Sequence, residues 1–266
     1  MIITFSSIQT NCKLDKYEEN FKNATDLLKN LPETDRHIVL LPELWTSGFT
    51  ENLSAADIAN KEILNSLMDL AVSKNLVIAG SYVVQENKNF YNQLIVIHSN
   101  GRDIAKYNKI HLFPQMREKT LFIKGSNLAL VQIWGVKISL AICYDLRFPE
   151  LFRDYAAMKT EVCILPAQWP LKRMPHFKTL LSARAIENQM IFLATNTCGK
   201  TENTVFGGSS SLIDASGKII FELDNHPQAF TEKVNIDGLE KLRSDFPVLE
   251  DANLRIPNEI DTFVFS

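Results

Sequence analysis

The chain has 266 residues, with 28 Lys plus Arg against 31 Asp plus Glu, and a formal net charge of −3. Hydrophobic residues make up 45% and charged residues 22%, which excludes a disordered, collagen-like or coiled-coil chain. The slightly acidic balance argues against a dedicated nucleic-acid-binding protein, because such proteins usually carry a basic stripe and a pI above about 9.

Short apolar runs alternate with helical patterns along the chain. Apolar residues that recur every three or four positions predict helices at residues 16–31, 54–74, 149–158 and 178–188. Buried or alternating runs predict strands at residues 2–9, 37–44, 76–84, 92–99, 103–113, 134–143, 161–168, 190–197, 209–217 and 218–224. The strand within 37–44 should end at Pro42, because proline cannot continue a central ladder.

This alternation predicts an α/β fold, in which amphipathic helices cover a mixed sheet. About a dozen strands exceed what one open, twisted sheet usually holds, so two stacked sheets with helices outside suit the pattern. No stretch has the composition of a linker, and we expect one domain over residues 1–266, with residues 246–266 as a C-terminal tail. Phe263 and Phe265 make this tail partly hydrophobic, which suggests contact with a partner subunit.

Targeting and metal-binding signals are weak. The opening residues MIITFSSIQT have no cationic start, so we expect no signal peptide, and no stretch approaches the ~20 apolar residues that span a bilayer. The four cysteines, Cys12, Cys143, Cys163 and Cys198, form no CxxC pair and predict neither a zinc site nor a disulfide framework. We therefore expect a soluble cytoplasmic protein with no metal, no cofactor and no membrane or nucleic-acid partner.

The segment VKISLAICYDLRFPELF places Cys143 at the carboxyl end of an apolar run. Asp145 and Pro149 then mark a turn and the start of a helix. Ligand sites of α/β sheets lie at such strand ends, and a thiol there can be activated by helix dipoles and nearby cations. The alternative is a buried structural cysteine, which is common for a cysteine in a strand.

Two further segments place a charged side chain within apolar surroundings. Glu43 follows Pro42 directly, and a carboxylate among Leu41, Leu44 and Trp45 should be partly desolvated and therefore a better base. A solvated loop glutamate is the alternative.

Lys109 lies in the strand-like stretch KYNKIHLFP, flanked by apolar residues. Lysines are almost never buried without a partner, so a carboxylate partner is implied if this side chain points inward. A surface lysine is the alternative. Glu43, Lys109 and Cys143 together supply a base, a cation and a nucleophile.

These segments resemble the nitrilase superfamily of carbon–nitrogen hydrolases, in the same order along the chain. The matching motifs are LLPELW, YNKIHLF, ICYDLRFPEL, PAQWP, LLSARAIENQMIFLATN and FGGSSSLIDASGKII. The resemblance runs from Ile2 to about Asp245 and implies a four-layer α-β-β-α sandwich that assembles as a homodimer or higher homo-oligomer. CYDLRFPE with PAQWP and ARAIENQ resembles the omega-amidase branch, which hydrolyses the terminal amide of 2-oxoglutaramate and related 2-oxo acid amides.

The resemblance also implies roles for individual residues. Glu43 would accept the thiol proton while Cys143 attacks the carbonyl of a small-molecule amide. The ammonium of Lys109 and the backbone N–H of Tyr144 would stabilise the resulting oxyanion. The family carries a second glutamate, and Glu118 in MREKTLFIKG matches its position, where it would orient Lys109 or the substrate amide.

Two residues have both a substrate-binding and a structural interpretation. Arg147 could clamp a substrate carboxylate through its planar guanidinium, or it could pair with Asp145 or Glu150 to brace the turn. Trp169 in PAQWP could line the pocket or pack in the core.

Rival functions remain open at this point. His176 follows Cys143 in the chain, as in several thiol hydrolases, although its helix-opening context lacks a matching Asn or Asp. A redox sensor would need a resolving thiol near Cys143, and Cys163 on the following strand is the candidate, although its surroundings favour a strand-core residue. His111 is expected to be packed and hydrogen-bonded. Other branches of the superfamily cut nitriles or N-carbamoyl groups, and a catalytically silent binding protein could keep the fold.

Overall fold

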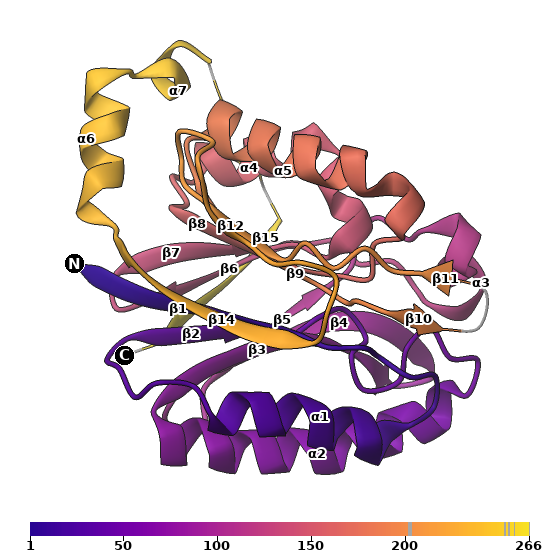
Figure 1. The fold of residues 1–266 in the computed structure, drawn as a ribbon. Helices are drawn as coiled ribbons and strands as arrows, with labels where there is room; N and C mark the ends of the chain where they lie inside the picture. Colours follow the sequence, from indigo (N-terminus) through magenta and orange to yellow (C-terminus); the bar gives the residue numbers. More distant parts are fainter. Residues whose placement is uncertain (202–203, 253, 255, 258, 266) are drawn as a thin grey trace.

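Two stacked mixed β-sheets form the centre of the computed structural model, which describes residues 1–201, 204–252, 254, 256–257 and 259–265 (Figure 1). The first sheet has, in spatial order, β14 (Gln228–Asn235), β1 (Ile2–Gln9), β2 (His37–Leu40), β3 (Leu76–Glu86), β4 (Asn89–Ile97) and β5 (Ile104–Asn108). The second has β13 (Ile219–Glu222), β12 (Ser211–Ile213), β9 (Ile191–Asn196), β8 (Val162–Ala167), β7 (Val136–Leu140), β6 (Leu128–Ile133) and β15 (Ile260–Phe265).

Helices cover both outer faces of this pair of sheets. Helices α1 (Tyr17–Lys29) and α2 (Leu53–Lys74) lie on the first sheet, and α4 (Pro149–Ala157) and α5 (Met174–Asn188) lie on the second (Figure 1). The remaining short elements are α3 (Glu118–Leu121), α6 (Asp237–Asp245), α7 (Val248–Asp251), the hairpin β10 (Lys200–Thr201) and β11 (Thr204–Val205), and the 3₁₀ turns η1 (Pro114–Met116), η2 (Cys143–Arg147) and η3 (Leu171–Arg173). The predicted α/β fold and its four-layer α-β-β-α sandwich are confirmed.

Alternating side chains explain why the central strands are apolar on both faces. On β1, Phe5 packs between the two sheets, whereas Ile8 packs against the outer helices. On β2, Ile38 likewise packs between the sheets, and Val39 packs against the outer helices. Successive strand residues point to opposite faces, and here each face meets another apolar layer, so the strands read as nearly continuous hydrophobic runs.

The four predicted helices and the predicted strands are present, with corrections at their ends. β2 stops at Leu40, two residues before Pro42. The strand predicted at 134–143 is shorter, because Trp134 and Gly135 form the turn between β6 and β7 with positive φ angles of 52° and 85°, and β7 ends at Leu140. The strands β6, β14 and β15 were not predicted from the sequence.

The C-terminal segment adds an edge strand to the second sheet. β15 pairs in parallel with β6, from Ile260 opposite Leu128 to Phe265 opposite Ile133. Phe265 is 6% exposed, and its ring centroid lies 5.2 Å from that of His98, which directly follows β4 of the first sheet. Phe265 therefore packs on its own chain, whereas the contact of the tail with a partner subunit stays a prediction. Residues 253, 255, 258 and 266 of the tail lie outside the described residues. Among the described residues, none of the helices has the length and apolar character needed to cross a bilayer.

Because His37 on β2 is buried, we expect the free energy of unfolding to fall at acidic pH. Its Nε2 lies 2.7 Å from the Ser6 hydroxyl, and burial lowers its pKa from 6.5 to about 4. Between these two pH values the unfolded chain binds a proton that the folded chain does not, so the free energy of unfolding falls as the pH falls below 6.5.

We expect the variant His37→Gln to lose less stability than the wild type between pH 7.5 and 5.0, by roughly 2 kcal/mol. Urea unfolding of both proteins at the two pH values measures this difference. Equal losses in the two proteins would contradict the assignment.

Candidate active site

The three side chains selected from the sequence come together at one edge of the two sheets. Glu43 lies three residues beyond the end of β2, and Lys109 directly follows β5. Cys143 lies three residues beyond the end of β7 in the opposite sheet. β2, β5 and β7 all run toward this edge, which is where ligand sites of α/β sheets form. A fourth predicted residue, Glu118, opens the short helix α3 and lies in the same cluster.

Glu43 is fully buried and is held by donors from three different segments. Its Oε1 accepts hydrogen bonds from Lys109 Nζ at 2.6 Å and Asn92 Nδ2 at 2.8 Å. Its Oε2 accepts one from the backbone N–H of Gln168 at 2.9 Å. The Gln168 side chain also donates to the Glu43 carbonyl oxygen at 2.7 Å. These bonds fix the carboxylate in one orientation.

Lys109 is buried between two carboxylates, as its apolar surroundings required. Its Nζ donates to Glu43 Oε1 and, at 2.7 Å, to Glu118 Oε2. The backbone of this segment is fixed too, since the N–H of Gly125 donates to the Lys109 carbonyl at 2.9 Å. A Cβ at Gly125 would lie 2.1 Å from the carbonyl oxygen of Asn108, so only glycine permits this close packing.

Cys143 begins the 3₁₀ turn η2 in a backbone conformation that is uncommon for residues with a side chain. Its φ is 44°, and Leu44, directly after Glu43, has a φ of 41°. Such left-handed residues cost about 1–2 kcal/mol and are frequent at functional turns. Cys143 is buried, with 5% of the residue exposed.

The electrostatics of the cluster require a proton acceptor for the thiol. Burial raises the pKa of Cys143 well above its ordinary value, and the Glu43 carboxylate beside the thiol raises it further, against the opposing effect of Lys109. Burial alone would lower the pKa of Lys109, but Glu118 and Glu43 raise it above the ordinary value. At neutral pH the thiol is therefore protonated and Lys109 is an ammonium, and Glu43 lies beside both groups.

Asp145 joins the nucleophile turn to the lysine segment. This buried carboxylate accepts hydrogen bonds from the Tyr107 hydroxyl at 2.8 Å and from the backbone N–H of Ile142 at 2.9 Å. It also accepts one from the backbone N–H of His111 at 3.0 Å, and His111 Nδ1 lies 2.8 Å away. The bonds span both sheets, so Asp145 sets the position of Cys143 relative to Lys109. It is thus unavailable to Arg147 as a partner.

Arg147 lies over aromatic rings at the edge of the site. Its guanidinium carbon is 4.7 Å from the ring centroid of Trp169 and 5.9 Å from that of Tyr144. Within the described part of the chain it pairs with no carboxylate, so the alternative pairing with Asp145 or Glu150 is wrong.

Trp169 packs in the core as one of its two interpretations expects, and its role in lining a substrate pocket stays a prediction. It is buried against Phe177, with ring centroids 5.1 Å apart, and it supports Arg147. Its Nε1 also donates to the carbonyl oxygen of Arg173 at 2.9 Å.

The rival residues lie in other surroundings. His176 contacts Arg147 through Nδ1 at 3.4 Å and is exposed on α5. Cys163 is fully buried in β8, and burial raises its pKa to about 12, which suits a core residue rather than a resolving thiol. His111 is packed as expected, with its ring stacked on Phe148 at 3.7 Å, although it follows the end of β5 instead of lying on a strand.

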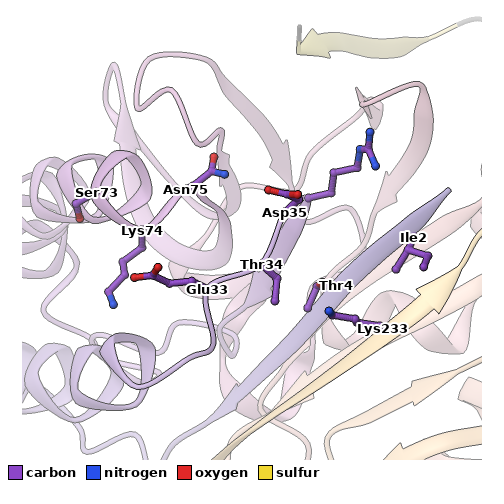
Figure 2. Close-up of a pocket in the computed structure, with 10 residues that line it drawn as sticks. Ile2, Thr4, Glu33, Thr34, Asp35, Ser73, Lys74, Asn75 and Lys233 are labelled. Carbon is purple, nitrogen blue, oxygen red and sulfur yellow. The ribbon is translucent and has the colours of Figure 1, made fainter.

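Open cavities lie beside the site and far from it. One of about 570 Å³ is lined by residues that include Tyr144 and Phe148, next to the nucleophile turn. Another, of about 670 Å³, is lined by Glu33, Lys74 and Lys233 (Figure 2). That second cavity lies at the amino ends of β1 and β2, the opposite end of these strands from Glu43.

The sandwich with a thiol, a carboxylate and an ammonium at its strand ends is suited to hydrolysis through a cysteine. A family model described as carbon–nitrogen hydrolase matches residues 4–243. Because this match spans most of the chain, the protein belongs to the carbon–nitrogen hydrolase family and is an enzyme of that class.

Named relatives cover most of the chain. A 2-oxoglutaramate amidase from Bacillus subtilis (strain 168) is 33% identical over 253 residues, covering 93% of this chain and 96% of the relative. The omega-amidase YafV from Escherichia coli (strain K12) is 33% identical over 226 residues, covering 83% and 86%. A solved carbon–nitrogen hydrolase superfamily protein from Xanthomonas campestris, with an arsenic adduct in its active site, superposes with a TM-score of 0.89 at 27% identity. It covers 97% of this chain and 100% of its own.

Proposed function

We propose that the protein is an amidase that hydrolyses the terminal amide of a small 2-oxo acid such as 2-oxoglutaramate and releases ammonia. The observation that carries the chemistry is the buried cluster in which Glu43 lies beside the Cys143 thiol and also binds Lys109 at 2.6 Å. The names of the two bacterial relatives support the choice of amide.

In the proposed reaction, Glu43 takes the thiol proton as the Cys143 sulfur forms a bond to the amide carbon. The carbonyl electrons move onto oxygen, where the Lys109 ammonium and the backbone N–H of Tyr144, the second residue of η2, stabilise the charge. The C–N bond then breaks, and Glu43 returns its proton to the departing nitrogen. Ammonia is released, and the acyl group remains on Cys143 as a thioester. Water gives a proton to Glu43 and attacks the thioester, and the sulfur leaves and recovers that proton. Glu118 holds Lys109 throughout.

Arg147 supports an anionic substrate. A guanidinium without a carboxylate partner in the described residues, resting on Trp169 and Tyr144, can bind a carboxylate through two parallel hydrogen bonds. A 2-oxo acid amide carries its carboxylate at the end opposite the amide. The amide could then react at Cys143 while the carboxylate binds Arg147.

The test is a panel of small amides, nitriles and N-carbamoyl compounds, assayed for ammonia release, with mass spectrometry for an acyl adduct on Cys143. We expect 2-oxoglutaramate and 2-oxosuccinamate to be the best substrates, and Cys143→Ala to abolish both turnover and adduct. Preference for a nitrile or an N-carbamoyl compound would assign the enzyme to another branch of the superfamily. No turnover and no adduct with any compound would indicate a silent binding protein.

Replacement of Arg147 should separate binding from chemistry. We expect Arg147→Ala to raise KM for 2-oxoglutaramate by roughly 10–100-fold, because a charge-assisted pair contributes about 1.5–3 kcal/mol. A neutral amide of similar length should lose much less. Steady-state kinetics on both substrates measure the effect, with the exposed Arg102→Ala as control. Equal losses on the charged and neutral amides would contradict carboxylate binding.

Assembly, domain structure and location are part of the same proposal. We propose one catalytic domain over residues 1–266, working as a homodimer or higher homo-oligomer in the cytoplasm and needing no metal or other cofactor. Light scattering on the purified full chain tests the oligomeric state.

A further inference from the structure

Asn92 on β4 contacts three parts of the candidate active site. Its Nδ2 donates to Glu43 Oε1 at 2.8 Å and to Glu118 Oε1 at 2.9 Å. Its backbone carbonyl accepts the N–H of Lys109 at 3.0 Å. The residue is 1% exposed, so these contacts are shielded from water.

The orientation of the Asn92 amide follows from its neighbours. The opposite orientation would place its Oδ1 against two carboxylates, so the amide nitrogen must face them. Oδ1 then lies buried without a hydrogen-bond partner among the described residues. An unpaired buried amide oxygen carries a free-energy cost, because it has lost its hydrogen bonds to water. The contacts of Nδ2 must therefore outweigh this cost in the folded protein.

The charges in the cluster explain why a neutral donor is needed. Glu43 and Glu118 share a single buried cation, Lys109, so the cluster carries one excess negative charge when both acids are ionised. Burial raises the pKa of Glu118, and the Glu43 carboxylate raises it further, while Lys109 opposes this. Asn92 donates to both acids at once without adding charge, which reduces the tendency of the pair to take up a proton.

We propose that Asn92 is a positioning residue that keeps both buried carboxylates ionised and fixed around Lys109, so that Glu43 is free to accept the thiol proton. This inference rests on the role proposed for Glu43 in amide hydrolysis. The charged and titratable groups that face the cluster are Glu43 after β2, Lys109 after β5, Glu118 of α3 and Cys143 of η2.

The expected consequence is a change in pH dependence rather than a uniform loss. Without the Asn92 amide the cluster takes up a proton at a higher pH and loses its base. The acidic limb of the kcat/KM profile should therefore move up by about one pH unit, with a roughly tenfold loss on that limb. At higher pH the variant should regain most of its activity. A purely structural role would lower kcat/KM by the same factor at every pH.

The test uses Asn92→Leu, which is close in shape but has no donor, and Asn92→Ala, which keeps the test available if the leucine variant does not fold. Gln93→Leu is the matched control, because Gln93 is next on the same strand but donates to Asn108 and Glu86 instead. We expect both Asn92 variants to shift the acidic limb and Gln93→Leu to leave it in place.

A second readout needs no substrate turnover. Alkylation of Cys143 by iodoacetamide, followed by mass spectrometry across the same pH range, should show the same shift in the Asn92 variants. An active wild type whose Asn92 variants keep the wild-type acidic limb and alkylation profile would overturn the inference alone. A wild type that releases no ammonia from any amide would overturn the proposed function instead.

Discussion

Glu43→Gln is expected to lower kcat for 2-oxoglutaramate by at least about 10³-fold. The substitution keeps the shape of the side chain but removes the proton acceptor next to a thiol whose pKa burial raises well above its usual range. General acid–base catalysis contributes typically 10²–10⁴-fold, and in this mechanism Glu43 serves both the formation and the hydrolysis of the thioester. Ammonia release under saturating substrate measures the loss.

Two comparisons make the Glu43 result specific. Glu161→Gln changes a carboxylate that accepts the backbone N–H of Lys137, away from the cluster, and should keep wild-type kcat. Glu118→Gln should lower kcat yet leave iodoacetamide alkylation of Cys143 closer to the wild-type rate, because Glu118 bonds Lys109 and Asn92. Near-normal turnover by Glu43→Gln would show that Glu43 is not the general base.

The strand ends were predictable because they have local signals. Pro42 lacks the N–H that a ladder needs, and Glu43 follows it directly, so the end of the strand and the carboxylate placed just beyond it could be predicted together. The partner of Lys109 was predictable as a type, since a buried lysine requires a carboxylate. That Lys109 pairs with both Glu43 and Glu118 was not predictable, because these pairs depend on how β2, β5 and α3 meet in the fold.

The missed strands depend on distant pairing. β15 is an edge strand whose ladder partner, β6, lies about half a chain away in sequence, and no local pattern specifies that pairing. The β6–β7 turn was hidden by Trp134, a bulky residue whose φ of 52° is unusual for its type. Because Trp134 is apolar, it was assigned to the strand that follows, and the turn before that strand was not predicted.

The missed site residues carry no local signal either. Asn92 and Gln168 are ordinary polar residues near strand ends. The group of Gln168 that binds Glu43 is its backbone N–H, which the residue type does not reveal. Asp145 was interpreted as a turn residue and a possible partner of Arg147, whereas it connects Tyr107 and Ile142 across the two sheets. Their roles arise from contacts between segments that only the folded chain brings together.

Removal of the buried cation should harm stability and catalysis through separable causes. Lys109→Met keeps a long unbranched side chain but leaves Glu43 and Glu118 facing each other without the ammonium that now lies 2.6 and 2.7 Å from them. Breaking a buried ion pair on one side typically costs about 3–5 kcal/mol of folding free energy. The loss of one oxyanion donor adds about 2.7–4 kcal/mol to the barrier, a fall in kcat of roughly 10²–10³-fold.

A double variant distinguishes the two causes. Lys109→Met with Glu118→Gln returns the cluster to one excess negative charge, so urea unfolding should show much of the lost stability regained. Ammonia release should stay as low as in Lys109→Met, because the oxyanion still lacks its ammonium. The exposed Lys106→Met on β5 is the matched control and should preserve both properties. Activity that recovers together with stability in the double variant would show that Lys109 serves only to neutralise the carboxylates, and that another group stabilises the oxyanion.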